Sequence, residues 1–264
     1  MENHGFYKFI LPLEKGIFNK LLNSADFEDV ANGRKGNHLV DSQGDQVPIV
    51  RTTTKYNKPA NYFAEIHTDI VESIKSVACD NQDLQNLPLS FNNALIETYD
   101  HSYTKMKYHS DQNMDLADGS FIALFSCYEQ LDELPEQALR KLKVKSKATE
   151  EEFEFSLENN SVILFSLFTN TNFQHKIVLE IPEDSKLDNL NQRWLGITFR
   201  QSKTFIHFKD GVPHFSNGEL LKLADKEQSK AFYKLRSLEN SSVNFSYPAI
   251  SYTLSTGDIL EPKK

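Results

Sequence analysis

Two side chains that can bind a metal stand two positions apart in the sequence, His109 and Asp111. Residues two apart on a β-strand point to the same face, so this imidazole and this carboxylate can converge on one point. Two such ligands do not hold a catalytic metal alone, and an isolated histidine, His175, follows in a β-prone segment. Two histidines and one aspartate form the ligand set that holds non-haem Fe(II) with coordination positions left open. We therefore expect a metal site formed by His109, Asp111 and His175.

A later segment, residues 193–200 with the sequence Arg-Trp-Leu-Gly-Ile-Thr-Phe-Arg, is typical of a β-strand and has an arginine at each end. A guanidinium stays charged when buried and can bind a carboxylate through two parallel hydrogen bonds. Arg193 and Arg200 are seven positions apart and point to opposite faces of a regular strand, so only a β-bulge would bring both to one ligand. The segment therefore predicts a buried cation, suited to a dicarboxylate, at Arg200.

The composition is that of a globular protein with many strands. The chain has 264 residues, of which 39% are hydrophobic and 25% charged, and its 19 Phe and 10 Tyr favour strands. This length can bury the core of one large β-rich domain, or of a domain with an extension. The formal net charge of −8 argues against a basic field over the whole protein that would capture nucleic acid, but this net charge is compatible with a local basic patch.

Cysteine use and the N-terminal residues indicate the compartment. Only two cysteines, Cys79 and Cys127, are present, so we expect no disulfide framework and a reducing environment. The first eight residues lack the basic region and apolar run of a signal peptide, and no apolar stretch reaches the length needed to cross a membrane. We therefore expect a cytoplasmic protein that does not associate with a membrane, with the nucleus as an open alternative; no pattern indicates its oligomeric state.

The middle of the chain consists of short β-prone segments separated by loops. Strands are expected at residues 93–99, 103–111, 121–128, 152–157, 161–168, 173–181 and 193–208. About eight strands with short connections are typical of a jelly roll or closed sandwich. Residues 131–149 are charged and rich in lysine, and we expect a solvated insertion there.

Helices are expected on both sides of this strand-rich region. Apolar residues recur at helical spacing from Pro59 to Cys79, and a shorter helix is expected near the N-terminus. Residues 24–47 are rich in Asp, Asn and Gly and are predicted to be a loop. Towards the other end, a capping box at residues 216–219 predicts a helix that continues to about Leu238.

In this order, these segments resemble the AlkB-like group of Fe(II)/2-oxoglutarate-dependent dioxygenases. The matching stretches are residues 95–99, 108–111, 174–175 and 196–200, within a resemblance that covers residues 91–203. The resemblance implies a double-stranded β-helix in which His109, Asp111 and His175 bind Fe(II). It also implies that 2-oxoglutarate and O2 are consumed and that succinate and CO2 are released. A substrate carbon would be hydroxylated, which removes it as formaldehyde when it is an N-methyl group.

The residues that the resemblance implies for cosubstrate binding are Arg200, Tyr99, Arg193, Tyr103 and Thr198. The chain departs from the group at two positions. Glu97 stands where the group has asparagine, and a carboxylate there would repel a carboxylate of the cosubstrate. Trp194 stands where the group has its first arginine. Arg200 would then act with the two tyrosines alone, unless a β-bulge turns Arg193 inward.

We therefore expect an α+β fold in three regions, built on a double-stranded β-helix (jelly roll) of about eight strands with flanking helices. Residues 1–90 would form N-terminal helices and a substrate lid packed on the core. Residues 91–208 would form the double-stranded β-helix with the catalytic site, and residues 209–264 a C-terminal helical extension.

The substrate class stays open at this point. We place nucleic-acid demethylation first because it follows from the resemblance, and hydroxylation of a small molecule or a protein side chain, which the acidic composition favours, is the alternative. Arg51, Lys55 and Tyr56 are the N-terminal candidates for a basic, aromatic lid over the site. Lysines alternate at positions 141, 143, 145 and 147 and could contact phosphates, but a solvated hairpin explains them equally well because three glutamates follow at 150–152. The alternatives to an oxygenase are a cupin-type metal enzyme and a catalytically silent binding module.

Overall fold

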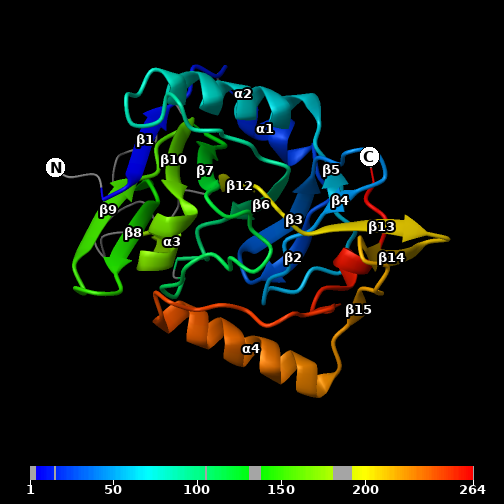
Figure 1. Ribbon diagram of the computed structural model, residues 1–264. Coiled ribbons are helices and arrows are strands. Elements are labelled where there is room, and N and C mark those ends of the chain that lie inside the picture. Colours follow the sequence, from blue (N-terminus) through cyan, green and yellow to red (C-terminus); the bar gives the residue numbers. More distant parts are fainter. Residues whose placement is uncertain (1–3, 15, 105, 131–137, 181–191, 264) are drawn as a thin grey trace.

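The computed structural model describes residues 4–14, 16–104, 106–130, 138–180 and 192–263 (Figure 1). Its largest sheet has eight strands in the order β1-β10-β7-β12-β6-β3-β2, with β5 also paired to β3. All neighbours in this sheet are antiparallel except β3 and β5. Its strands are β1 (Phe6–Ile10), β2 (Glu28–Ala31), β3 (Arg34–Val40), β5 (Asn61–Tyr62), β6 (Asn93–Tyr99), β7 (Phe121–Tyr128), β10 (Ser161–Ser166) and β12 (Trp194–Arg200).

A second, three-stranded antiparallel sheet faces the large one and has the order β11-β8-β9. Its strands are β8 (Lys141–Ser146), β9 (Glu152–Ser156) and β11 (Phe173–Val178). Buried side chains from both sheets form one core, to which the small sheet contributes Leu142 and Ile177 and the large sheet Leu124 and Phe165. Two facing sheets around a shared core are the jelly-roll arrangement expected from the sequence.

The other face of the large sheet is covered by α1 (Ile17–Leu22) and α2 (Glu65–Cys79), and α2 runs along the top of the molecule in Figure 1. Ile70 and Ile74 lie one turn apart on α2, and both are fully buried in a core that also contains Ile197 and Phe199 of β12. Because side chains alternate along a strand, Thr198 and Arg200 of β12 point the other way, towards the small sheet. This alternation decides which side chains of β12 can reach the site.

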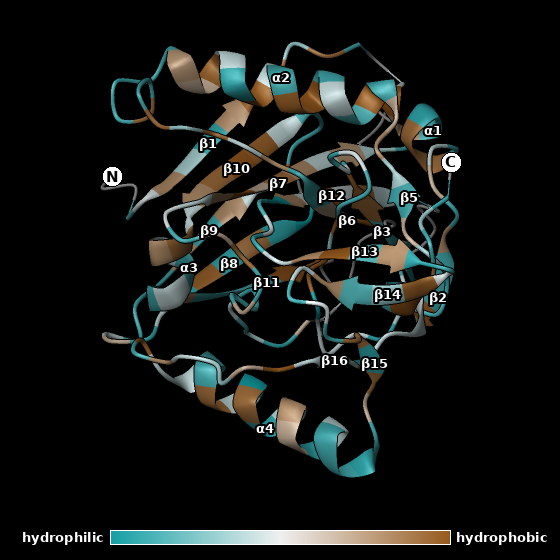
Figure 2. Ribbon diagram, turned by 45° about the vertical axis from the view of Figure 1, so that its right-hand side comes forward, coloured by the Kyte–Doolittle hydropathy of each residue, from teal (hydrophilic) through white to brown (hydrophobic). Residues whose placement is uncertain are grey.

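The C-terminal part of the chain adds small sheets and a helix around the core. These elements are β13 (Phe205–Lys209), β14 (Val212–Phe215), β15 (Lys222–Leu223), α4 (Lys226–Ser241), β16 (Tyr252–Thr253) and the 3₁₀ helix η3 (Thr256–Ile259). β13 also pairs with β4 (Val47–Pro48), and the short helix α3 (Leu167–Asn172) connects β10 to β11. α4 lies on the opposite side of the molecule from α2 and is mostly hydrophilic (Figures 1 and 2). Its fully buried Phe232 anchors it to the body of the protein. Within the described residues, no helix is both long enough and apolar enough to cross a membrane.

The expected α+β jelly roll with flanking helices and a C-terminal helix is confirmed. The strands expected at 93–99, 121–128, 152–157, 161–168 and 173–181 correspond to β6, β7, β9, β10 and β11. The N-terminal region contributes more than helices, because β1, β2, β3 and β5 belong to the large sheet. The loop expected at 24–47 is wrong, since β2 and β3 lie there. β3 pairs with β6 from Arg34 opposite Tyr99 to Val40 opposite Asn93, and such pairing outweighs weak strand propensity.

Three further local predictions are wrong. Within the described residues of the stretch 103–111, which leave out 105, there is no strand, because Arg140 donates at 2.6 Å to each of the carbonyls of Asp100 and Tyr103 and holds an irregular turn. The long strand expected at 193–208 is two strands, because Ser202 donates from its hydroxyl to Ile49 O at 2.6 Å and redirects the chain. The C-terminal helix begins at Lys226, where the Asp225 side chain accepts from the backbone of Gln228 at 2.8 Å.

The lysine-rich insertion expected at 131–149 is only partly described. Residues 131–137 lie outside the described residues, and 141–146 form β8. Leu142 and Val144 of β8 are fully buried, whereas Lys141, Lys143 and Lys145, which alternate with them, are only partly buried and point away from the core. This segment is therefore part of the jelly roll and not a solvated insertion.

Candidate metal centre and cosubstrate pocket

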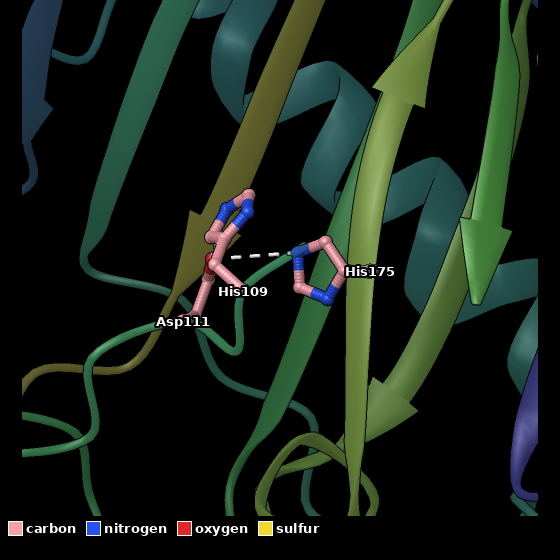
Figure 3. Close-up of side chains that lie close together, drawn as sticks. All are labelled: His109, Asp111 and His175. Atoms are coloured by element: carbon pink, nitrogen blue, oxygen red, sulfur yellow. Dashed lines mark ion pairs between the residues drawn. The ribbon is translucent and has the colours of Figure 1, made fainter. Parts of the chain in front are cut away.

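The three predicted metal ligands lie together between the two sheets (Figure 3). One ligand atom from each of His109, Asp111 and His175 can be chosen so that all three lie within 4.8 Å of one another. Oδ1 of Asp111 lies 3.6 Å from Nε2 of His175 and 3.9 Å from Nε2 of His109. Three ligand atoms at these separations can bind one ion, with room on the open side for further ligands.

Backbone contacts explain why these side chains converge. His109 and His175 form an isolated antiparallel bridge, in which each backbone N–H donates to the other's carbonyl, at 2.9 and 2.7 Å. The bridge extends the small sheet by one pair beside β11. Asp111 is fixed next, because its backbone N–H and C=O each bond to the Asn170 side chain at 2.8 Å. Asn170 lies on α3, whose N-cap is Ser166.

The protonation of the ligands suits a metal. Nδ1 of His109 lies 3.0 Å from the carbonyl of Lys107, so Nδ1 carries the proton and Nε2 keeps its lone pair. Burial lowers the pKa of His109 to about 3, and the neighbouring His175 adds to this effect. Burial alone would raise the pKa of Asp111, but Arg200 and the two imidazoles hold it well below its usual range. A neutral imidazole at His109 and an ionised carboxylate at Asp111 are therefore available at neutral pH.

Arg200 supports Asp111 from the large sheet. Its Nε and Nη2 atoms donate to Oδ2 of Asp111 at 2.9 and 2.7 Å, which leaves Oδ1 facing the imidazoles. Nη1 of Arg200 is buried and has no hydrogen-bond partner among the described residues. A buried donor of this kind fits a carboxylate placed beside the metal. The ligand set and this unused donor together fit Fe(II) with a 2-oxo acid.

A cavity of about 120 Å³ opens beside the triad. Its walls include apolar side chains from both sheets, namely Leu95, Leu124, Leu142, Phe165 and Ile177. Thr198 and Arg200 of β12 also line it, and so do the three threonines Thr52, Thr53 and Thr54, Gln112 and Arg236. The cavity is therefore apolar along its sides and polar where the metal and the substrate would meet.

A second charged cluster lines the same cavity. Glu97 of β6 is paired with Arg34 of β3, whose Nε and Nη2 lie 2.7 and 2.5 Å from Oε1 of Glu97. Two buried tyrosines also donate to this carboxylate, Tyr56 to Oε1 at 3.2 Å and Tyr99 to Oε2 at 2.7 Å. Burial raises the pKa of Tyr99 well above its ordinary value, so its hydroxyl stays protonated as a donor.

Four of the five expected cosubstrate residues lie at or beside this cavity. Arg200, Tyr99 and Thr198 line it, and the Tyr103 hydroxyl lies 3.5 Å from Nη1 of Arg34. Arg193 does not, and its prediction as a cosubstrate residue is wrong. Its guanidinium pairs with Glu129 at 2.8 and 2.5 Å and lies over the ring of Phe18, which belongs to the core on the helix-covered face.

The register of β12 explains where Arg193 lies. β12 pairs with β6 and β7 without a shift from Trp194 onward, so no bulge turns Arg193 inward. Trp194 takes the inward position, where its indole donates to Ser126 Oγ at 2.5 Å. The indole lies over Gly196, at which a Cβ would come within 2.1 Å of the ring. The large sheet therefore presents an aromatic ring where a second arginine was expected by resemblance.

The lid expected from Arg51, Lys55 and Tyr56 does not form. Arg51 is buried and bonds to both oxygens of Asp115, at 3.0 and 2.7 Å, outside the cavity lining. Tyr56 is buried against Glu97, and of the three only Lys55 is exposed. The intervening threonines are the part of this segment that reaches the cavity.

The C-terminal helix α4 contributes contacts that the sequence did not predict. Its Asn240 side chain accepts from the backbone N–H of Ser110 at 2.9 Å, and Glu239 accepts from that of Asn113 at 2.9 Å. Arg236 donates to the carbonyl of Ser110 and lines the cavity. Through these contacts α4 fixes the backbone of the loop that carries His109 and Asp111. These contacts span more than 120 residues, and no local sequence signal indicates them.

Comparisons with known proteins find similar solved structures at low sequence identity. No curated protein sequence matches the chain. Similar solved structures include that of OsALKBH1, with 16% identity, a TM-score of 0.47, and coverage of 75% of this chain and 96% of that one. A prolyl hydroxylase from Trichoplax adhaerens in complex with a hypoxia inducible factor peptide fragment has 11% identity, a TM-score of 0.47, and coverage of 76% and 84%. A Pseudomonas putida prolyl-4-hydroxylase has 11% identity, a TM-score of 0.44, and coverage of 75% and 94%.

A protein-family comparison covers most of the chain. The family model described as the 2OG-Fe(II) oxygenase superfamily matches residues 13–200. This range contains every element that lines the site apart from α4, including the three ligands and Arg200. Because the match spans well over half of the sequence and the ligand side chains meet in the structure, the protein belongs to the 2OG-Fe(II) oxygenase superfamily.

Proposed function

We propose that this protein is an Fe(II)- and 2-oxoglutarate-dependent dioxygenase that hydroxylates a small molecule or a protein side chain. The observation that carries the proposal is the convergence of His109, Asp111 and His175 with Arg200 behind the carboxylate. The family match favours an oxygenase over a cupin-type metal enzyme, and the intact ligand set argues against a silent binding module. Iron bound here, with 2-oxoglutarate and O2, supplies oxygen insertion into a C–H bond, and succinate and CO2 are the co-products.

The side chains of the chain have three roles in this reaction. Arg200 holds Oδ2 of Asp111, so that Oδ1 stays directed to the metal position. Nη1 of Arg200 offers the remaining donor to a carboxylate of the cosubstrate. Leu124, Leu142 and Phe165 line the cavity with apolar surface and limit the water that can reach the reacting atoms.

The surface charges support a substrate other than nucleic acid. The alternating lysines of β8 are paired with glutamates: Lys141 with Glu154 at 2.5 Å, Lys143 with Glu180, and Lys145 with Glu150. Arg51, one of the expected lid cations, is buried in an ion pair with Asp115. A protein that binds nucleic acid needs cations free to neutralise phosphates. Neither of these two groups supplies them.

The polar residues of the cavity support a small substrate or a side chain with polar groups. Three threonines and Gln112 can offer neutral hydrogen bonds, and Arg236 adds one cation that is already shared with Glu239 at 3.1 Å. Such a lining recognises hydroxyl, amide or single carboxylate groups better than it recognises a polyanion.

The proposal is tested by succinate release. Purified protein with Fe(II) and 2-oxoglutarate is incubated with a metabolite fraction, with a peptide library, with free nucleosides and with methylated oligonucleotides. We expect release above the uncoupled level with the metabolite or peptide fraction, and no release with the Asp111→Ala variant. Stimulation by methylated oligonucleotides alone, lost steeply as salt is added, would instead establish nucleic-acid demethylation.

A further inference from the structure

We propose that Arg34 binds the distal carboxylate of the 2-oxo acid cosubstrate and that Glu97 competes with this carboxylate for the same position. Glu97 would thereby weaken 2-oxoglutarate binding and reduce the preference for a dicarboxylate. This inference rests on the proposed function, because it assigns residues to the cosubstrate of that reaction.

The position of Arg34 follows from strand register. Arg34 lies opposite Tyr99, and Gly36 lies opposite Glu97, so Arg34 shares the inner face of the sheet with both cavity residues. Its guanidinium carbon lies 5.8 Å from the ring centre of Tyr99 and 5.7 Å from that of Tyr103. The arginines that line the cavity are Arg34, Arg200 and Arg236. Of these, Arg34 lies on the large sheet away from the metal ligands.

Strand register places Arg200 and Glu97 at different ends of the cavity. Along β12, Arg200 pairs with Asn93 and Gly196 pairs with Glu97. Four residues of strand span roughly 13 Å between backbone positions. Arg34 lies at the level of Trp194, two residues beyond Gly196, but its guanidinium bonds to Glu97 and so reaches this interval. Thr198 and Leu95 line the cavity between Glu97 and Arg200. A five-carbon 2-oxo acid held at the metal by its first carboxylate would direct its second one towards Arg34.

Glu97 already has the hydrogen bonds that a second carboxylate would need. It accepts from Arg34, from Tyr56 at 3.2 Å and from Tyr99 at 2.7 Å, and its side chain is only 10% exposed. Gly36 leaves the space for this arrangement, because a Cβ there would lie 3.1 Å from Cγ of Glu97 and 3.4 Å from the Tyr56 hydroxyl. The protein therefore contains its own carboxylate in a carboxylate-binding cluster.

Two carboxylates cannot share this cluster without cost. Like charges a few ångströms apart repel strongly away from bulk water. The Nη1 donor of Arg34 is only weakly used, since it lies 3.5 Å from the Tyr103 hydroxyl. Replacing Glu97 by glutamine removes the repulsion and frees Arg34. Glu97→Gln should therefore strengthen 2-oxoglutarate binding, whereas mutation of a binding residue usually weakens it.

The test compares two ligands that differ only at the distal end, 2-oxoglutarate and 2-oxopentanoate. Dissociation constants are measured by calorimetry with Mn(II) in place of Fe(II) and without O2, so that no turnover is needed. Trp194 is the only tryptophan in the sequence and its ring centre lies 4.8 Å from that of Tyr99, so its fluorescence gives a second readout close to the distal end. Both readouts report binding independently of activity.

We expect Glu97→Gln to tighten 2-oxoglutarate binding at least tenfold and to change 2-oxopentanoate binding less than twofold. The double variant Arg34→Met with Glu97→Gln leaves no unpaired charge, which protects the fold, and should bind the two ligands with equal affinity. Arg193→Met is the matched control, because Arg193 also pairs with a glutamate but on the other face of the sheet. It should leave both dissociation constants within twofold of the wild type.

Two results would overturn the inference: unchanged or weaker 2-oxoglutarate binding by Glu97→Gln, or a preference of tenfold or more for 2-oxoglutarate in the double variant. If both ligands bind and neither responds to Glu97, the inference fails and the proposed function stands. If neither ligand binds the wild type or any variant with Mn(II) present, both fail together.

Discussion

Asn240 links the C-terminal helix α4 to the metal-ligand loop, and its removal tests whether α4 positions the ligands. The Asn240 side chain accepts from the backbone N–H of Ser110, which stands between the two ligands of the loop, at 2.9 Å. Ser110 is 1% exposed, so water does not replace this acceptor unless the loop moves. A buried donor left without a partner costs roughly 1–3 kcal/mol. Asn240→Ala should therefore favour a displaced loop in which the amide is hydrated.

This free-energy cost then weakens metal binding, because the loop must return to its original position when the ion binds. Since each 1.4 kcal/mol corresponds to a factor of ten, affinity for Mn(II) should fall by about 5- to 150-fold. The metal-free protein should lose little stability, since its loop can relax. Calorimetric titration with Mn(II) and thermal unfolding without metal measure the two quantities.

The neighbouring Ser241→Ala variant is the control, because among the residues that the structure describes that hydroxyl bonds only to the Ser237 and Leu238 carbonyls of its own helix. It should bind Mn(II) as the wild type does. Unchanged affinity in Asn240→Ala, or an equal loss in both variants, would refute the idea that α4 positions the loop.

Two further predictions concern other parts of the structure. Arg200→Met should raise the 2-oxoglutarate dissociation constant more than tenfold, whereas Arg193→Met should change it less than twofold; equal losses would show that Arg193 reaches the site. Burial raises the pKa of Asp258 to about 7 from an ordinary value of 3.8, so the neutral acid stabilises the fold and this stability is lost as pH rises from about 4 through 7. Asp258→Asn should remove that loss: unfolding temperatures at pH 5 and pH 8 should differ less than in the wild type, and an unchanged difference would contradict the assignment.

The ligand set could be predicted from sequence because it depends on residue types and short spacing. His109 and Asp111 were expected to converge as neighbours on a strand, and they do converge although the segment is a loop. The bridge between His109 and His175 supplies strand-like geometry at the one position where it is needed. The opposite orientations of Arg193 and Arg200 were also predictable, because alternation along β12 is undisturbed.

The remaining parts of the site depend on tertiary pairing that the sequence does not express locally. Arg34 lies in a polar, glycine-containing segment typical of a loop, and becomes a strand residue only because β3 pairs along the whole of β6. Tyr56 lies in a segment whose basic and aromatic residues are typical of a lid. Its side chain is buried instead, because its hydroxyl donates to the buried carboxylate of Glu97. Asn240 contacts a loop 130 residues away, and nothing in the polar sequence of α4 indicates that contact.

The metal centre is tested most directly by measuring Mn(II) binding to the wild type and to His109→Ala, Asp111→Ala and His175→Ala. The exposed His101→Ala variant is the control, and circular dichroism confirms that each variant is folded. We expect each ligand variant to lose at least a hundredfold in affinity while His101→Ala stays within twofold of the wild type. Unchanged Mn(II) affinity in all three ligand variants would contradict the metal centre on which the proposed function rests.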